Sequence, residues 1–335
     1  MSSELPLLLP KNKKTIAAHP CGYISIRKNT DMIQQKNLEP SGVLVINKHA
    51  GVTSHDIVNK IRRLYNTKRV GHAGTLDPMA TGVLVILVGR AAKASEYAHT
   101  ADKSYRATIK LGIKSDTEDI SGNCIRTNLT VPDERTVLDV CQSMLGKSMQ
   151  IPPMYSAIKQ DGKKLYELAR EGKTVEREAR EIEVYSIEAY KKADDEYLMD
   201  CKVSKGTYIR TLCTDIGEKC GCGAVMASLE RTNAGGFDIA DSHTLEELSN
   251  LDRESLVSLL HPIEELFFDY PIVRLDDFFY KLCYSGCEIY QKKIKTNHPV
   301  GQYVRLYSRD GFFGLGQVRE YEQGSAVKCE KLFVL

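Results

Sequence analysis

The chain has 335 residues, of which 42% are hydrophobic and 27% charged, a balance typical of a globular protein rather than a disordered chain. Its length exceeds that of a typical single domain, so we expect two domains and an appendage. The formal net charge of +2 does not by itself indicate a nucleic-acid partner.

Ten cysteines are scattered along the sequence. Cys220 and Cys222 have the wrong spacing for a zinc knuckle, and no second pair is placed to complete four ligands. We therefore expect reduced thiols in a cytoplasmic protein that binds no metal. The apolar run at residues 5–10 is too short for a signal peptide or a membrane span.

Residues 1–40 show no sustained helical or strand period. We expect a flexible basic arm there, with a short strand at 23–26 as the alternative. The run 43–46 predicts a short buried strand. Thr53 or Ser54 then caps an expected helix whose apolar face is made of Ile57, Val58, Ile61, Leu64 and Tyr65.

The most informative segment is Gly71-His-Ala-Gly-Thr-Leu-Asp-Pro-Met-Ala-Thr-Gly-Val-Leu84. One carboxylate, Asp77, stands among small and apolar residues. Glycines permit backbone conformations closed to other residues, and Pro78 restrains the residue before it. The pattern predicts a rigid loop that presents one acid at the mouth of a buried strand at 83–88. For an isolated Asp-Pro pair, an ordinary turn that caps a helix is the alternative.

Further along, strand-like alternation occurs at 104–112, 180–188 and 197–203. Helices are expected at 131–145 and 206–220. Because strands and helices mix without strict alternation, the pattern predicts an α+β domain with a mixed sheet.

Asp269-Tyr-Pro271 is the expected linker. Four short strand-like pieces follow it, and Arg309-Asp-Gly311 is a hairpin signal between two of them. Several short strands in so few residues predict a small β-barrel.

The segment around Asp77 closely resembles the signature of the TruB family of bacterial tRNA pseudouridine(55) synthases, and the resemblance extends from about residue 42 to the C-terminus. It implies that Asp77 is the catalytic residue. It also implies a catalytic domain at 41–268, with a mixed or antiparallel sheet flanked by helices. Residues 271–335 would form a PUA-like RNA-binding barrel, in which Gly311-Phe-Phe-Gly-Leu-Gly316 is a weaker motif.

The same resemblance implies the roles of four more residues. Tyr105 would stack on the uracil that leaves the RNA stack, although a strand aromatic packed on the core is the alternative. Arg210 would pair with Asp77 and hold it ionised, because an opposite charge favours the charged form. Tyr208 would contact the nucleotide, and Leu229 would line the pocket.

Two further positions follow from the resemblance. His72 would contact the substrate around the target base. Lys48 fills the lysine of a family turn in which His49 here replaces the usual proline. Lys48 would either support the loop or neutralise a phosphate.

Residues 151–178 resemble the thumb insertion with which the family closes over the T-arm of tRNA. Tyr155 and Tyr166 offer stacking surfaces there. A solvated helical hairpin is the alternative. The expected phosphate contacts are Lys159, Lys163, Lys164 and Arg170.

The implied function is that of a monomeric isomerase without cofactor, which converts the T-loop uridine at position 55 of tRNA to pseudouridine. A carboxylate serves this reaction as nucleophile or base, through attack at ribose C1′, attack at base C6 or proton abstraction from the sugar. One alternative is a guide-RNA-dependent synthase of the dyskerin branch. Another is an RNA-folding chaperone or tRNA-binding protein without essential catalysis.

Overall fold

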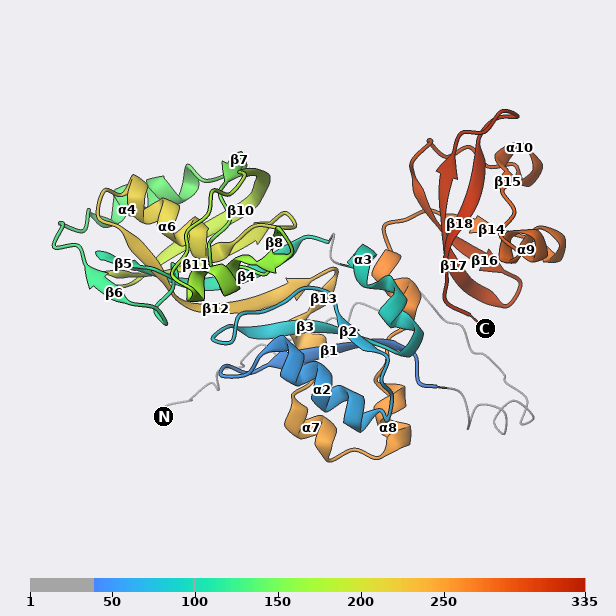
Figure 1. The fold of residues 1–335 in the computed structure, drawn as a ribbon, viewed down its shortest axis with the longest axis horizontal. Coiled ribbons are helices and arrows are strands. Elements are labelled where there is room, and N and C mark those ends of the chain that lie inside the picture. The colour runs from blue at the N-terminus through green and yellow to red at the C-terminus, as the bar shows by residue number, and fades with distance from the viewer. Residues whose placement is uncertain (1–38, 99–100, 335) are drawn as a thin grey trace, which may run out of the picture. The chain divides into compact units, whose positions relative to one another are not determined.

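The computed structural model describes residues 39–98 and 101–334, so the arm expected at 1–40, with its alternative strand, lies outside the described residues up to residue 38 (Figure 1). A nine-stranded sheet forms the larger part of the described chain. Its strand order is β1-β3-β12-β4-β11-β10-β7, with β2 beside β3 and β13 beside β12. The strands are β1 (Gly42–Lys48), β2 (Val70–His72), β3 (Thr81–Val88), β4 (Lys103–Leu111), β7 (Gly146–Gln150), β10 (Arg180–Ala193), β11 (Glu196–Val203), β12 (Ala224–Ala234) and β13 (Phe237–Asp238).

The strands β1 and β3 pair antiparallel along their whole length and are buried on both faces. This burial explains why 43–46 and 83–88 are continuous apolar runs instead of alternating ones. β12 runs parallel to β3 but antiparallel to β4, which confirms the predicted mixed sheet. At the parallel contact Gly82 has φ +92°, and a Cβ there would lie 2.3 Å from the carbonyl oxygen of Arg231, so only glycine fits.

Helices pack on the sheet at two places, α2 (Ser54–Leu64) beside β2 and the pair α4 (Glu134–Gln142) and α6 (Ile209–Lys219) beside β10 and β12. Thr53, one of the two residues expected to cap the first of these helices, is the N-cap of α2 and forms a capping box with Asp56. In Figure 1, α4 and α6 lie together over the half of the sheet that contains β10 and β11. α4 begins later than expected because Asp133 caps it. The remaining elements of this part are η2 (Gly89–Ala94), α3 (Ser95–Ala98), β5 (Ile113–Ser115), β6 (Cys124–Arg126), η3 (Ile239–Asp241), α7 (Leu245–Ser249), α8 (Arg253–Ser258) and η4 (Ile263–Phe267).

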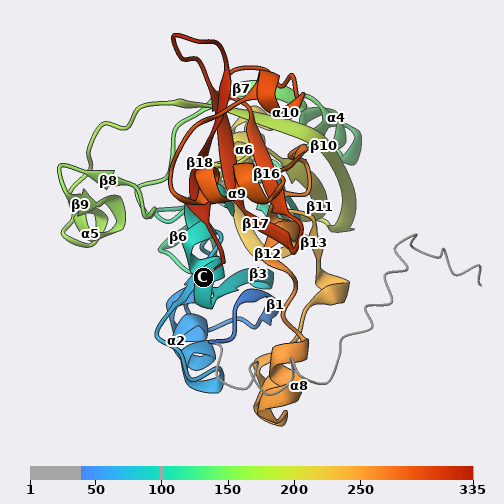
Figure 2. The ribbon, with the colours of Figure 1, turned by 90° about the vertical axis from the view of Figure 1, so that its right-hand side faces the viewer.

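The segment expected to form the thumb contains a short hairpin, β8 (Lys159–Gln160) and β9 (Lys163–Lys164), followed by α5 (Leu165–Arg170). The turn of this hairpin has positive φ at Asp161 and Gly162. It is therefore not the helical hairpin considered as an alternative. Figure 2 shows this segment projecting at one side of the chain.

The C-terminal part forms a curled five-stranded sheet in the order β14-β16-β17-β18-β15, which confirms the expected strand-rich PUA-like fold. The sequence patterns missed its two helices. Its core includes Val304, Leu306 and Phe313, which are at most 1% exposed. The elements are β14 (Ile272–Arg274), α9 (Asp277–Tyr284), β15 (Ile289–Tyr290), α10 (Gln291–Ile294), β16 (Tyr303–Ser308), β17 (Gly311–Arg319) and β18 (Ala326–Leu332).

An aromatic cluster joins this sheet to the preceding segment. Phe267 of η4 is 2% exposed and packs with Leu315 and Phe333. Lys331 adds an ion pair to Glu96 of α3 at 2.7 Å. No helix among the described residues combines the length and apolar composition needed to cross a bilayer.

Candidate active site

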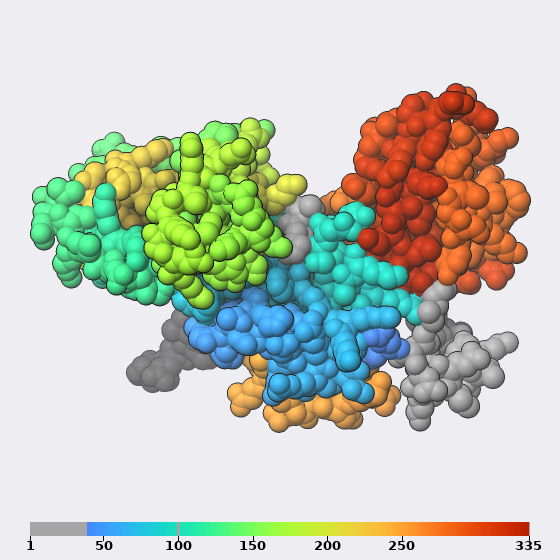
Figure 3. Space-filling view, viewed as in Figure 1, coloured from blue at the N-terminus to red at the C-terminus, as the bar shows by residue number. Residues whose placement is uncertain are grey.

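A cleft of about 1410 Å³ lies beside the loop that carries Asp77. The walls come from the start of α2, the start of α6, β4, β12 and the segment around α5. In Figure 3 the light-green surface of that last segment adjoins the blue surface of α2 on the same face. Most of the predicted site residues line this cleft, namely His72, Asp77, Tyr105, Lys164, Arg170, Tyr208, Arg210 and Leu229.

The centre of the cleft is an ion pair between two residues that are 133 positions apart in sequence. Arg210 Nε lies 2.9 Å from Asp77 Oδ2, and its Nη2 lies 3.4 Å from Oδ1. The side chain of Arg210 is 6% exposed, whereas that of Asp77 is 35% exposed. The pairing predicted from sequence is present. Because the carboxylate of Asp77 is the more exposed of the two groups, a ligand in the cleft would contact Asp77 and not Arg210.

The electrostatics of Asp77 differ from the sequence expectation in one respect. Arg210 lowers the pKa of Asp77, as expected for an opposite charge, but burial raises it more, and Asp119 adds a further upward contribution. The pKa of Asp77 is therefore raised above its ordinary value. A carboxylate perturbed in this way and placed in a cleft is typical of a functional site.

Lys48 supports the loop from behind. It is 0% exposed, and its Nζ donates hydrogen bonds to the carbonyl oxygens of Ala80 at 2.6 Å and Pro78 at 3.1 Å. Burial lowers the pKa of Lys48 to about 8, while Asp77 opposes this shift. Of the two roles considered for Lys48, the structure favours loop support, because a buried ammonium that faces backbone carbonyls is not available to a phosphate.

A second buried cation, Arg231 of β12, was missed by the sequence analysis. It is 1% exposed and donates to the carbonyl oxygens of Val83 at 2.7 Å, Gly74 at 3.2 Å and Thr75 at 3.4 Å. Together Lys48 and Arg231 bind loop carbonyls on both sides of Asp77. Hydrogen bonds from charged donors are stronger than those between neutral groups, so the backbone is held firmly on both sides of Asp77.

Arg210 is itself held by a second loop, residues 117–121, which the sequence analysis did not single out. Its Nη1 donates to the carbonyl oxygen of Thr117 at 3.2 Å, and its Nη2 donates to that of Tyr155 at 2.8 Å. Asp119, 5% exposed, lies 3.9 Å from Arg210 Nε and accepts hydrogen bonds from Thr117 and Ser121. The guanidinium is thus bound through all three of its nitrogens and presents one fixed face to Asp77.

Tyr105 and Leu229 face the cleft from adjacent strands, β4 and β12. Tyr105 is 8% exposed and Leu229 is 8% exposed, yet both line the cavity. Burial raises the pKa of Tyr105, and a hydrogen bond with Arg231 opposes that rise. Packing on the core and lining of the cleft are therefore compatible for Tyr105, which belongs to the buried core cluster and also lines the cavity.

Tyr208 is the N-cap of α6. Its backbone N–H donates to Gln150 Oε1 at 2.8 Å, and Gln150 Nε2 donates back to its carbonyl oxygen at 3.1 Å. This reciprocal pair joins the start of α6 to the edge strand β7. His72 lies on β2, half-buried, and lines the cleft from the opposite side of the loop.

The expected thumb residues divide into two groups. Lys164 and Arg170 line the cleft and both lie over the ring of Tyr166, at 5.4 Å and 5.3 Å from its centroid. Lys159 and Lys163 are exposed on the hairpin outside the cleft wall.

Known proteins of one family resemble the chain over most of its length. The family models for TruB family pseudouridylate synthase (N terminal domain) and for the tRNA pseudouridylate synthase B C-terminal domain match residues 62–209 and 210–267. The tRNA pseudouridine synthase B of Alkaliphilus oremlandii is 42% identical over 286 residues, which cover 83% of this chain and 93% of that protein. The chain belongs to the TruB family.

A second TruB family relative, the tRNA pseudouridine synthase B of Francisella tularensis, is 38% identical over 298 residues, 88% of this chain and 96% of its own. Among solved structures, the Cbf5-Nop10-Gar1 complex matches with a TM-score of 0.68 and 25% identity over 90% of this chain and 87% of that one. The archaeal box H/ACA sRNP Nop10-Cbf5 complex, at 23% identity and TM-score 0.67 over 90% and 88%, shows the same fold. Pseudouridylate synthases are isomerases, so this TruB family chain is an enzyme.

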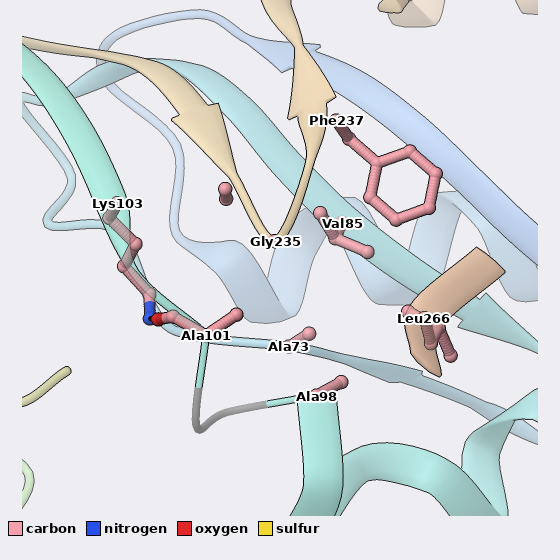
Figure 4. A pocket seen from close by; sticks show the side chains of 9 residues that line it. Ala73, Val85, Ala98, Ala101, Lys103, Gly235, Phe237 and Leu266 are labelled. Carbon is pink, nitrogen blue, oxygen red and sulfur yellow. Dashed lines mark hydrogen bonds between the residues drawn. The ribbon is translucent and has the colours of Figure 1, made fainter. Parts of the chain in front are cut away.

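A second cavity, shown in Figure 4, has a volume of only about 20 Å³. Val85, Phe237 and Leu266 surround it with apolar groups. A cavity needs about 10–15 Å³ of such volume to hold one water molecule, so this one has room for about one. Among the described residues of this TruB family chain, no group of three or more His, Cys, Asp or Glu side chains could hold a metal ion.

Proposed function

We propose that this protein isomerises the T-loop uridine at position 55 of tRNA to pseudouridine, with Asp77 acting on the target nucleotide. The observation that carries the proposal is the Asp77–Arg210 ion pair, which presents a half-exposed carboxylate to a cleft of about 1410 Å³. The cleft is also lined by Tyr105, which offers an aromatic face for a base.

The reaction moves the ribose from N1 to C5 of the same base. The C1′–N1 bond breaks, a C1′–C5 bond forms, C5 loses its proton and N1 gains one, so the product has the same atoms as the substrate. Asp77 serves as nucleophile or base in this rearrangement. Arg210 holds the carboxylate in one orientation without being consumed.

Access to the base requires that the nucleotide leaves its stack, because a stacked uridine cannot bring C1′ or C5 to a carboxylate at the cleft wall. The cleft offers Tyr105 as a stacking surface, Leu229 as an apolar wall, and His72 and Tyr208 as polar neighbours. These residues are the proposed substrate-binding set.

The proposed RNA-binding surface is the segment 151–178, where Lys164 and Arg170 line the cleft and Lys159 and Lys163 extend it outward. The strand-rich part at 271–335 is proposed as a second RNA-binding domain, and 41–268 as the catalytic domain. The protein is proposed to act as a cytoplasmic monomer without an obligate protein partner; the cysteines among the described residues are free thiols, which suits a reducing compartment.

A tRNA substrate is favoured over a guide-RNA-dependent reaction by the degree of similarity. Relatives named tRNA pseudouridine synthase B are 38–42% identical over most of both chains, whereas the Cbf5 structures are 23–25% identical. Catalysis is favoured over simple RNA binding by the environment of Asp77. Its carboxylate lies in a cleft, has a raised pKa and is oriented by a buried arginine, a combination that is common at catalytic sites and that RNA binding alone does not require.

The test is mapping of pseudouridine by mass spectrometry after the purified chain is incubated with an unmodified tRNA transcript. We expect one pseudouridine, at the T-loop uridine, without any added RNA or protein. A transcript with cytidine at that position is the matched control and should remain unmodified. A requirement for a second RNA would contradict the proposal in favour of the guide-dependent alternative.

A further inference from the structure

Arg210 depends on the loop 117–121 for two of its contacts, the Thr117 carbonyl and Asp119. We propose that Glu118 and Thr211 form a positioning pair that fixes this loop to α6 and thereby sets the geometry of the Asp77–Arg210 ion pair. The inference rests on the proposed function of Asp77 and adds two residues that do not touch the reacting nucleotide.

The contact itself is short and largely shielded from water. Thr211 Oγ1 donates a hydrogen bond to Glu118 Oε2 at 2.6 Å. Thr211 is 7% exposed, and Glu118 is half-buried. A hydrogen bond to a charged acceptor is stronger than one between neutral groups. Loss of the donor leaves a carboxylate that is shielded from water and has no hydrogen bond to compensate for its desolvation.

The backbone conformation of Glu118 is one that its own side chain disfavours, so contacts with other parts of the chain must impose it. Its φ is +64°, in the left-handed region that disfavours residues with a Cβ. Such a conformation persists where surrounding contacts impose it. Here the backbone contacts are with β12, since the N–H of Met226 donates to the Glu118 carbonyl oxygen at 3.1 Å and the N–H of Ile120 donates to the Met226 carbonyl oxygen at 3.0 Å.

The Glu118–Thr211 contact is next to the contacts that hold Arg210, so the two are linked through the chain. Thr117, Glu118 and Asp119 are consecutive, and they contact the consecutive residues Arg210 and Thr211. Any displacement of the loop away from Thr211 also displaces the acceptors that hold Arg210. Because Arg210 orients Asp77, the displacement reaches the carboxylate without any change in the residues that line the cleft around the base.

The charges around Glu118 make the hydroxyl of Thr211 important. Burial raises the pKa of Glu118, and the hydrogen bond from Thr211 is the largest influence that lowers it, followed by Arg210 and Arg177, while Asp119 raises it. Asp215, one helical turn after Thr211, has its pKa raised to about 6 by burial and by Glu118. Without the hydroxyl, Glu118 lies near two other acids and has lost its main hydrogen-bond donor.

The test compares Thr211→Val, which removes the hydroxyl at nearly constant volume, with Thr211→Ser, which keeps it. We expect Thr211→Val to lower kcat on tRNA about tenfold, since small misplacements of catalytic groups are costly, while KM stays within about twofold. The acid limb of the kcat profile, which reports Asp77, should move to higher pH because Arg210 stabilises the ionised form less well. Thr211→Ser should restore both.

The matched control is Lys114→Ala. Lys114 of β5 and Glu218 of α6 form an ion pair at 2.7 Å with both side chains more than half exposed, and this pair joins α6 to the strand that precedes the loop without contacting Arg210. We expect this variant to retain the wild-type kcat and acid limb.

A second measurement does not depend on turnover. Carboxyl-carbon NMR, with the Asp77 signal identified from Asp77→Asn, should show a higher pKa for Asp77 in Thr211→Val than in the wild type. An unchanged pKa, an unchanged kcat, or a loss of activity that Thr211→Ser does not restore would each overturn the inference. Failure of the wild type to modify tRNA, with the shift in the Asp77 pKa still observed, would count against the proposed function alone.

Discussion

The loop around Asp77 and the segment around α5 both bring charged side chains to the same cleft, but they hold them in opposite ways. The cations that hold the loop are few and sheltered: the side chain of Arg210, from α6, is 6% exposed, and Lys48, from β1, is 0% exposed. The cations around α5 are more exposed to solvent: Arg170, which lines the cleft, is exposed, and so is Lys163 outside the cleft, at 60%. A sheltered charge acts strongly at one fixed place, whereas an exposed charge acts weakly and is screened by salt.

This difference suits two tasks. Chemistry on one base needs a carboxylate held in one geometry, and the loop achieves it with bonds from Lys48, Arg231 and Arg210. Binding of an RNA backbone needs several cations that adapt to phosphates, and none of these has to be positioned closely. Substitutions in the two regions should therefore change different kinetic constants.

The largest effect is expected from Asp77→Asn, which removes the charge but keeps the shape. The rate of pseudouridine formation should fall by at least about 10³-fold, because the acting group is lost, while tRNA binding remains near that of the wild type. Single-turnover rates and filter binding measure the two quantities. Asp310→Asn, in an exposed turn where the side chain is 88% exposed, is the control and should be fully active.

The next effect is expected from Arg210→Lys. A lysine keeps the charge but loses the planar set of donors that contacts Asp77, Thr117 and Tyr155 together, so kcat should fall about 10²-fold with little change in KM. The control is Arg106→Lys, which alters an exposed two-bond pair with Asp200 at 2.8 and 2.9 Å. Equal reductions of kcat in both variants would contradict the special role of the buried arginine.

The pH dependence follows from the direction of the Asp77 shift. Burial raises the pKa of Asp77 above 3.8, so its protonated form persists to higher pH than that of an ordinary aspartate. Because the ionised form is the reactive one, the rate should fall on acidification through this raised pKa and level off above it. A single-turnover profile whose acid limb lies at or below the ordinary aspartate value would show that Asp77 is not the titrating group.

A change of stability instead of rate is expected from Lys48→Met. It leaves the buried carbonyl oxygen of Ala80 without its Lys48 donor, which costs about 2 kcal/mol in the free energy of unfolding. Urea denaturation measures this change. Lys60→Met, at an exposed position of α2, should change the free energy of unfolding by less than about 0.5 kcal/mol.

The smallest effect is expected from the double variant Lys164→Ala, Arg170→Ala. KM for tRNA should rise severalfold at low salt, kcat should be unchanged, and the slope of log affinity against log salt should fall by about 1 for each phosphate that is no longer neutralised. The control, Lys191→Ala with Lys192→Ala, removes two cations from the end of the β10–β11 hairpin. An equal change of slope in both would mean that the segment around α5 has no special role in binding.

The sequence by itself determined the parts of this protein that are local in the chain. The buried strands, the Thr53 cap and the glycine-rich loop follow from residue patterns, since burial, capping and positive φ impose residue types within a few positions. The pairing of Asp77 with Arg210 was also anticipated, but only through resemblance to a family.

Tertiary structure alone decided how those parts are held. Arg231 reaches Gly74 from 157 positions away, and Thr211 reaches Glu118 from 93 positions away. Arg231 binds a backbone carbonyl, which every residue has, and Thr211 binds the carboxylate of Glu118 in an acidic turn. Neither contact produces a residue spacing by which it could be recognised in the sequence. Bonds between distant segments depend on how the sheet brings β12 and α6 beside the two loops, and that arrangement exists only once the chain is folded.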